Sequence, residues 1–249
     1  MNEIFSRNVM YWGEKVQQVL KKQHVFVFGL GGVGGYAADA LARAGIGELT
    51  LIDFDEVSQS NINRQLVALK STIGQKKTDL FKSRLEDINP ELKLNIIEEF
   101  YDESMNERIF ARKPDFVIDA IDTQRSKVAL LVYCHKNNIP VFSSMGAGNR
   151  LDPTKLYICD ISEYNKKYCN FVKNMQYNLT KYGVTSGITC VFSDEKPKKP
   201  TVKAISHIEN NGEEFKKISP SSTPFVPPIA GYYLAFGVIN TIIKNLDKN

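Results

Sequence analysis

A polar stretch in the first third of this sequence is dense in side chains that can handle phosphate groups. It reads DFDEVSQSNINRQ over residues 53–65, a Gly-Gln-Lys-Lys run follows at 74–77, and an apolar run at 116–121 ends in a further acid. An arginine and a lysine can neutralise the charge of a triphosphate, and a carboxylate can hold a Mg²⁺ ion that bridges it. A hydride-transfer site has little use for such a set, because a helix N-terminus already holds the pyrophosphate of a dinucleotide. Arg64, Lys77 and Asp122 therefore favour cleavage of ATP between its α- and β-phosphates. The other candidate nucleotide-binding residues of these stretches are Asp53, Asp55, Asn61 and Gln65.

A glycine-rich turn precedes this stretch. Residues 25–28 are a short apolar run, typical of a strand buried on both faces of a parallel sheet. An Ala-rich helix is predicted over 36–44, and a second apolar strand over 48–52 ends at Asp53. In such a unit the glycines let the backbone approach a phosphate, the helix N-terminus supplies free N–H groups, and the closing acid accepts hydrogen bonds from a ribose. We therefore predict a nucleotide site at the glycines of this turn, Gly29, Gly31, Gly32 and Gly34.

The remaining elements alternate in the manner of an open α/β sheet. Strands are predicted over 94–97, 116–122, 140–144, 155–159 and 187–193, and helices over 3–22, from the 74–77 run to 89, and over 102–111, 126–137 and 229–246. We expect a Rossmann-like, mostly parallel sheet with helices on both faces and an elaborated C-terminal region. The chain would be a single domain over 1–249, with a nucleotide-binding core at 1–158 and a substrate or dimer region at 159–249. Residues 210–228, rich in Asn, Gly, Ser, Pro and Lys, are predicted to form a loop or a partly disordered segment.

Three positions have more than one interpretation. A lysine at a helix start is unfavourable for the helix dipole, so Lys77 is a candidate to face an anion; the alternative is that Lys76 and Lys77 are simply exposed. Asp122, at the end of its predicted strand, is the better candidate for a metal, and Asp119 could be a structural acid. Cys190, set in an apolar strand, is expected to be a core thiol rather than a nucleophile or a sulfur-relay residue.

Composition limits the class of protein. The net charge of +4 permits an anionic partner such as nucleic acid but does not require one. The four cysteines include no CxxC pair, which argues against a zinc ribbon and a redox dithiol. The first residues do not read as a secretory signal, and the apolar stretch at 229–243 is too short to span a bilayer, so we expect a cytoplasmic protein with no membrane span. Interleaved lysines and aromatics between 164 and 203 suit RNA contacts, or else a lid or dimer surface.

Four motifs together give the chain a family resemblance. GLGGVG at 29–34, DFDEVSQSNINRQ at 53–65, GQKK at 74–77 and VIDAID at 117–122 resemble the adenylating domain of the ubiquitin-activating superfamily. The resemblance implies that Gly32 approaches the phosphates, that Asp53 binds the ribose and that Asp122 coordinates Mg²⁺. It also implies that the triphosphate is lined by Asn61, Arg64, Gln65 and Lys77. Phe5-Ser6-Arg7-Asn8 is similar to a family motif whose arginine reaches the nucleotide of the other protomer, so Arg7 is expected to act across a homodimer.

A narrower resemblance suggests a substrate. Superfamily members that activate carrier proteins commonly have paired CxxC motifs, which this chain lacks. INPE at 88–91, MGAGNRLDPTKL at 145–156 and CVFSDEKP at 190–197 instead resemble the bacterial tRNA threonylcarbamoyladenosine dehydratases. That resemblance implies ATP-dependent cyclisation of threonylcarbamoyladenosine beside a tRNA anticodon through an acyl-adenylate, with a cysteine desulfurase system as a possible partner. The alternatives are an adenylyltransferase for a sulfur-carrier or ubiquitin-like protein, and an NAD-dependent oxidoreductase or nucleotide-sensing protein.

Overall fold

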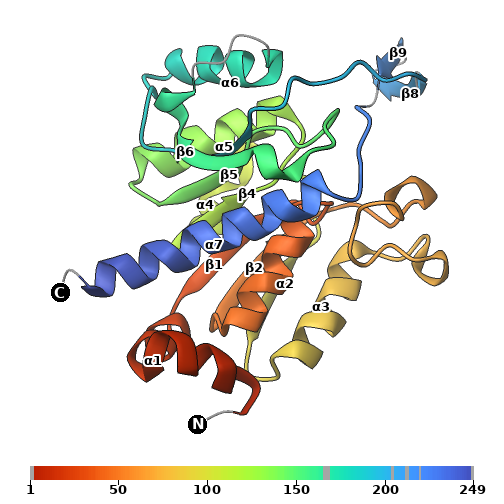
Figure 1. Ribbon diagram of the computed structural model, residues 1–249. Helices are drawn as coiled ribbons and strands as arrows, with labels where there is room; N and C mark the ends of the chain where they lie inside the picture. Colours follow the sequence, from red (N-terminus) through yellow and green to blue (C-terminus); the bar gives the residue numbers. More distant parts are fainter. Residues whose placement is uncertain (1–2, 165–168, 203–204, 211–212, 219, 248–249) are drawn as a thin grey trace.

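A seven-stranded sheet forms the centre of the molecule (Figure 1). The computed structural model describes residues 3–164, 169–202, 205–210, 213–218 and 220–247. Within them the strand order is β3-β2-β1-β4-β5-β7-β6, with β6 antiparallel to β7 and the other neighbours parallel. The predicted Rossmann-like architecture is therefore confirmed. The strands are β1 His24–Phe28, β2 Glu48–Ile52, β3 Lys93–Ile97, β4 Phe116–Asp119, β5 Val141–Ser144, β6 Leu156–Asp160 and β7 Thr189–Ser193.

Helices cover both faces of the sheet because its central strands are apolar on both sides. In β1, Val25 and Val27 pack in the core cluster that holds buried residues of α1, α2, α3 and α7, whereas Phe26 and Phe28 pack in the cluster that holds those of α4, α5 and α6. The helices are α1 Ser6–Leu20, α2 Gly34–Ala44, α3 Lys77–Ile88, α4 Asn106–Phe110, α5 Gln124–Lys136, α6 Asn170–Thr180 and α7 Val226–Asp247.

Helix α7 crosses the sheet beside α2 (Figure 1). The two helices approach closely because Gly231 has no side chain: a Cβ there would lie 2.2 Å from the carbonyl oxygen of Val33. By length and composition alone α7 could cross a membrane, yet 61% of its most apolar window is buried inside the protein. Its apolar character is therefore explained by packing in the core.

The structure corrects several sequence-based expectations. Strand β4 ends at Asp119 rather than at Asp122, because the Asp119 carboxylate accepts the Ile121 N–H in a local turn and so takes that N–H out of strand pairing. The predicted N-terminal helix is interrupted at Gly13, whose φ is +81°. Helix α6 was not predicted, and α7 begins at Val226. The first part of the expected 210–228 loop instead belongs to a two-stranded hairpin, β8 Ile205–Asn210 and β9 Glu213–Ile218, which stands apart from the large sheet (Figure 1). Residues 165–168, 211–212 and 219 of these segments lie outside the described residues.

Candidate nucleotide-binding site

The glycine turn joins β1 to α2 at the carboxyl edge of the sheet, where β4 also ends. Gly29 has a φ of +86°, and a Cβ there would lie 2.9 Å from the carbonyl oxygen of Ala120. A Cβ on Gly34 would lie 1.8 Å from the Gly29 oxygen. Glycine is needed at both positions, because only then can the α2 N-terminus come close to the ends of β1 and β4. The turn therefore presents a helix N-terminus at the edge where ligands bind in open α/β sheets.

The other two predicted glycines face the 61–65 segment. A Cβ on Gly32 would lie 3.2 Å from the carbonyl oxygen of Arg64 and from Cβ of Pro227, and a Cβ on Gly31 would lie 3.7 Å from Nε2 of Gln65. Because Gly31 and Gly32 have no side chains, the glycine turn can lie close to the Arg64 segment and to the start of α7.

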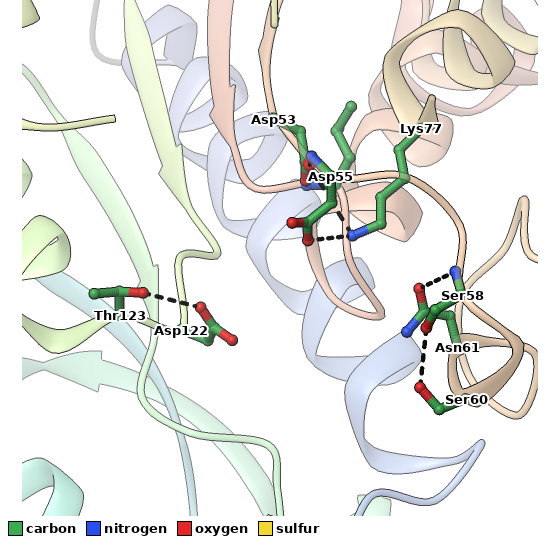
Figure 2. A network of polar contacts seen from close by, with 9 residues as sticks. Asp53, Asp55, Ser58, Ser60, Asn61, Lys77, Asp122 and Thr123 are labelled. Atoms are coloured by element: carbon green, nitrogen blue, oxygen red, sulfur yellow. Dashed lines mark hydrogen bonds and ion pairs between the residues drawn. The ribbon is translucent and has the colours of Figure 1, made fainter. Parts of the chain in front are cut away.

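Asp53 and Lys77 form the buried centre of the site (Figure 2). The Asp53 carboxylate accepts hydrogen bonds from the backbone N–H of Leu30 at 2.5 Å and of Asp55 at 2.8 Å, so it holds the glycine turn against the end of β2. Lys77 Nζ donates to Asp55 Oδ2 at 2.6 Å and lies 4.0 Å from Asp53 Oδ1. Burial raises the pKa of Asp53, and the charge of Lys77 opposes that rise.

The two adjacent lysines have different environments. Lys77 is buried, so the alternative that it is simply exposed is wrong. Lys76 is exposed and pairs with Glu98 at the surface. The ammonium group of Lys77 lies beside Asp53 and Asp55, at the carboxyl end of β2, where a bound anion could meet it.

Arg64, Asn61 and Gln65 come from one irregular segment after β2. Asn61 Oδ1 accepts a bond from the Ser58 N–H at 3.1 Å, and Arg64 donates to the carbonyl oxygen of Ser60 at 2.9 Å. Burial lowers the pKa of the Arg64 guanidinium, and the nearby charge of Asp122 partly offsets this. Gln65 is buried, and its Oε1 has no hydrogen-bond partner among the described residues. A buried unpaired acceptor of this kind is unusual outside ligand sites.

Asp122 lies on the turn after β4, across Figure 2 from Asp55 and Lys77. Its carboxylate is exposed and accepts a hydrogen bond from Thr123 Oγ1 at 3.4 Å. In the described part of the chain no three His, Cys, Asp or Glu residues cluster as a metal site. The single exposed carboxylate of Asp122 is nevertheless compatible with Mg²⁺, because this ion usually takes one or two protein carboxylates and completes its coordination with nucleotide phosphates and water.

Arg7 is not brought to the site of its own chain. It is exposed in the first turn of α1, where the neighbouring Asn8 donates to the carbonyl oxygen of Arg43 at 2.8 Å. Arg43 is at the far end of α2 from the glycine turn, about 15 Å away along the helix. Figure 1 shows α1 at the lower end of the molecule, away from the segment after β2.

An aromatic pair beside Asp53 was missed by the sequence reasoning. The rings of Phe54 and Phe100 meet edge to face with centroids 5.0 Å apart, and they are 57% and 46% exposed. Large exposed aromatics next to the acid that is predicted to bind ribose offer a surface on which a nucleotide base can pack. The signal was present, because Phe54 stands between two acids and Phe100 follows a strand.

Cys190 is a core thiol, as expected. It is fully buried in β7, and burial raises its pKa well above the ordinary value. A thiol in that setting is neither accessible nor ionised at neutral pH, so it lacks the properties of a nucleophile.

Comparisons with known proteins identify the family of this chain. The model of the ThiF family matches residues 5–247, so the chain belongs to the ThiF family. The tRNA threonylcarbamoyladenosine dehydratase of Bacillus subtilis is 41% identical over 245 residues, which cover 98% of this chain and 96% of that relative. The crystal structure of the Escherichia coli tRNA N6-threonylcarbamoyladenosine dehydratase, TcdA, in complex with ATP superposes with a TM-score of 0.87 at 30% identity, covering 98% of this chain and 96% of that one. The molybdopterin-synthase adenylyltransferase of Escherichia coli is 35% identical over 136 residues, 55% of this chain and 53% of that protein. The resemblance inferred from the motifs is thus confirmed.

Proposed function

We propose that this protein is an ATP-dependent enzyme that dehydrates N6-threonylcarbamoyladenosine in tRNA to its cyclic form. The observation that carries the proposal is that three elements meet the glycine turn: Asp53 beside Lys77 binds the Leu30 N–H, Arg64 approaches Gly32, and the turn before Asp122 approaches Gly29. The full-length similarity to the Bacillus subtilis dehydratase supports the choice of substrate.

The chemistry has two steps. A carboxylate is a poor electrophile, so a carboxylate oxygen of the modified nucleoside first attacks the α-phosphorus of ATP; pyrophosphate leaves and an acyl-adenylate forms. A nitrogen of the neighbouring carbamoyl group then attacks the acyl carbon and loses its proton, AMP leaves and a five-membered ring closes. The second step is intramolecular, so positioning supplies much of its acceleration. The net change in the nucleoside is the loss of one water.

The residues of the site suit binding and charge neutralisation. Lys77 and Arg64 would offset negative charge on the triphosphate, with Asn61 and Gln65 as amide partners. Asp53 would bind the ribose beside the Phe54–Phe100 pair. Asp122 would hold Mg²⁺ together with the phosphates, and the ion would supply charge neutralisation for the leaving pyrophosphate.

A homodimer with Arg7 acting in trans is part of the proposal. Three exposed aromatics support an interface on the face of the sheet that α1 and α7 cover: Tyr11 on α1, and Tyr232 and Phe236 on α7. Mixing two inactive variants, Arg7→Ala and Lys77→Ala, would then restore about a quarter of wild-type turnover, because half of the dimers would be mixed and each would have one complete site. No recovery after exchange of subunits would contradict the trans role. A cytoplasmic location and a cysteine desulfurase partner are supported by the family resemblance alone.

The experiment that tests the function measures AMP. The protein is incubated with ATP and Mg²⁺ and with tRNA that either contains or lacks threonylcarbamoyladenosine. AMP that forms only with the modified tRNA supports the proposal. AMP or pyrophosphate exchange that instead requires a carrier protein ending in Gly-Gly would move the assignment to the carrier-activating relatives, and binding of NAD in preference to ATP would overturn it.

A further inference from the structure

A buried polar cluster lies behind the turn that carries Asp122. Lys127 Nζ, from the first turns of α5, is 2.6 Å from Asp119 Oδ2, and Ser143 Oγ of β5 donates to the same oxygen at 2.6 Å. All three side chains are shielded from solvent. A lysine and an aspartate in such a place cost free energy to desolvate, and apolar residues of similar size often give a fold that is at least as stable. The cluster therefore calls for a reason other than stability.

The second oxygen of Asp119 connects this cluster to the site. Asp119 Oδ1 accepts a hydrogen bond from the backbone N–H of Ile121 at 3.1 Å, one residue before Asp122. The intervening Ala120 packs against the glycine turn, since a Cβ on Gly29 would lie 2.9 Å from its carbonyl oxygen. Lys127 and Ser143 hold Oδ2, and this fixes the direction of Oδ1. The carboxylate thus fixes the backbone from which Asp122 projects.

We propose that Asp119 is a positioning residue for Asp122 and sets the geometry in which the Asp122 carboxylate meets Mg²⁺ and ATP, while Lys127 is the counter-ion that offsets the buried charge of Asp119. The inference rests on the proposed function of Asp122. Groups that orient a metal ligand from behind change metal affinity by about tenfold to a hundredfold when they are removed. The effect should therefore appear in the Mg²⁺ requirement, even in a variant that folds well.

Two double variants separate positioning from stability. Lys127→Met with Asp119→Asn and Lys127→Met with Asp119→Leu both remove the buried charges and are matched at position 127. The asparagine retains an oxygen that can accept the Ile121 N–H, whereas the leucine does not. If the leucine variant does not fold, Asp119→Val with Lys127→Met takes its place.

The first readout needs no nucleotide. Amide hydrogen exchange over residues 119–124 should be at least about tenfold faster in the leucine variant than in the asparagine variant, since one backbone hydrogen bond separates them. The second readout is the Mg²⁺ concentration that gives half-maximal binding of a non-hydrolysable ATP analogue. It should rise about tenfold with leucine and stay within about twofold of wild type with asparagine.

Other results would overturn the inference. If both variants match wild type in both readouts, the cluster has no positioning role and only packs in the core. Two variants impaired to the same extent would assign the effect to the lost charges rather than to the oxygen that faces Ile121. A wild-type protein that binds no Mg-ATP would overturn the inference together with the proposed function, whereas failure of the variants alone leaves the function standing.

Discussion

Replacing Lys77 by methionine removes a buried cation from between two carboxylates. Lys77 Nζ lies 4.0 Å from Asp53 Oδ1, and the two side chains are only 4% and 6% exposed, whereas the side chain of Asp55 is 47% exposed and its pairing is screened by water. Two unit charges at that distance attract by about 4 kcal/mol at an effective dielectric constant of roughly 20. Because the variant also avoids the cost of desolvating the lysine, we expect a net loss of about 2 kcal/mol in the free energy of unfolding near neutral pH. The melting temperature would fall by about 4–8 °C for a chain of this size.

The loss of unfolding free energy in the Lys77→Met variant should depend on pH, because Asp53 can take up a proton. Burial already raises its pKa from 3.8, and without Lys77 it would rise further. A carboxyl group whose pKa is higher in the folded than in the unfolded state weakens the fold once it ionises, so stability falls as pH rises from 3.8 through the folded-state pKa. The penalty of the variant should therefore be largest above that pKa and shrink as the pH is lowered.

Urea unfolding followed by circular dichroism at about pH 7.5 and about pH 5 measures this. Lys76→Met is the matched control: it makes the same substitution one residue earlier, at an exposed lysine with a surface partner, and should leave the unfolding midpoint unchanged. An equal loss at both pH values, or an equal loss in the control, would refute the assignment of the effect to the buried Asp53–Lys77 pair.

Three further predictions test other parts of the site. Asp122→Ala changes an exposed side chain and should alter stability by less than about 0.5 kcal/mol, while AMP formation falls at least about a hundredfold; near-normal turnover would remove Asp122 from the site. Gly34→Ala should lower the unfolding free energy by about 3 kcal/mol, because its Cβ would lie 1.8 Å from a backbone oxygen of the glycine turn. Gly74→Ala, with nothing within 4 Å and a φ of +81°, should lose only about 1 kcal/mol in the same assay. Cys134 and Cys190 should react with thiol reagents only after unfolding, because burial raises the pKa of both thiols, and Cys190→Ala should retain turnover. Rapid labelling of the native protein at either cysteine would contradict this.

Periodicity and turn chemistry were sufficient to predict most of the fold. The apolar runs at β1, β2 and β5 are bounded by glycine, proline or polar residues, and the strands form there. Helix α6 was missed because polar residues, three of them asparagines, are interspersed along it, and the 162–181 segment was interpreted from its lysines and aromatics. Its buried Val172, Met175 and Leu179 nevertheless recur at helical spacing. The hairpin was missed because β9 is rich in charged residues, although the sequence between the two strands holds an Asn-Gly pair, a known hairpin signal.

The site was predictable in residue type but not in pairing. Nothing local in the sequence indicates that Lys77 meets Asp55, 22 positions away, because that contact depends on where α3 docks beside β2. The end of β4 was misplaced for a related reason. The apolar Ala120 and Ile121 look like a continuation of the strand, whereas Asp119 Oδ1 accepts the Ile121 N–H in a local turn, with Lys127 and Ser143 holding the other carboxylate oxygen.

The central claim is tested most directly by weighing the nucleosides. The protein is incubated with Mg-ATP and with tRNA that contains threonylcarbamoyladenosine, and the tRNA is then digested and analysed by mass spectrometry beside a reaction without ATP. The account predicts that this nucleoside loses the mass of one water, only with ATP, and that AMP appears in equal amount. An unchanged nucleoside in the presence of bound ATP would contradict it.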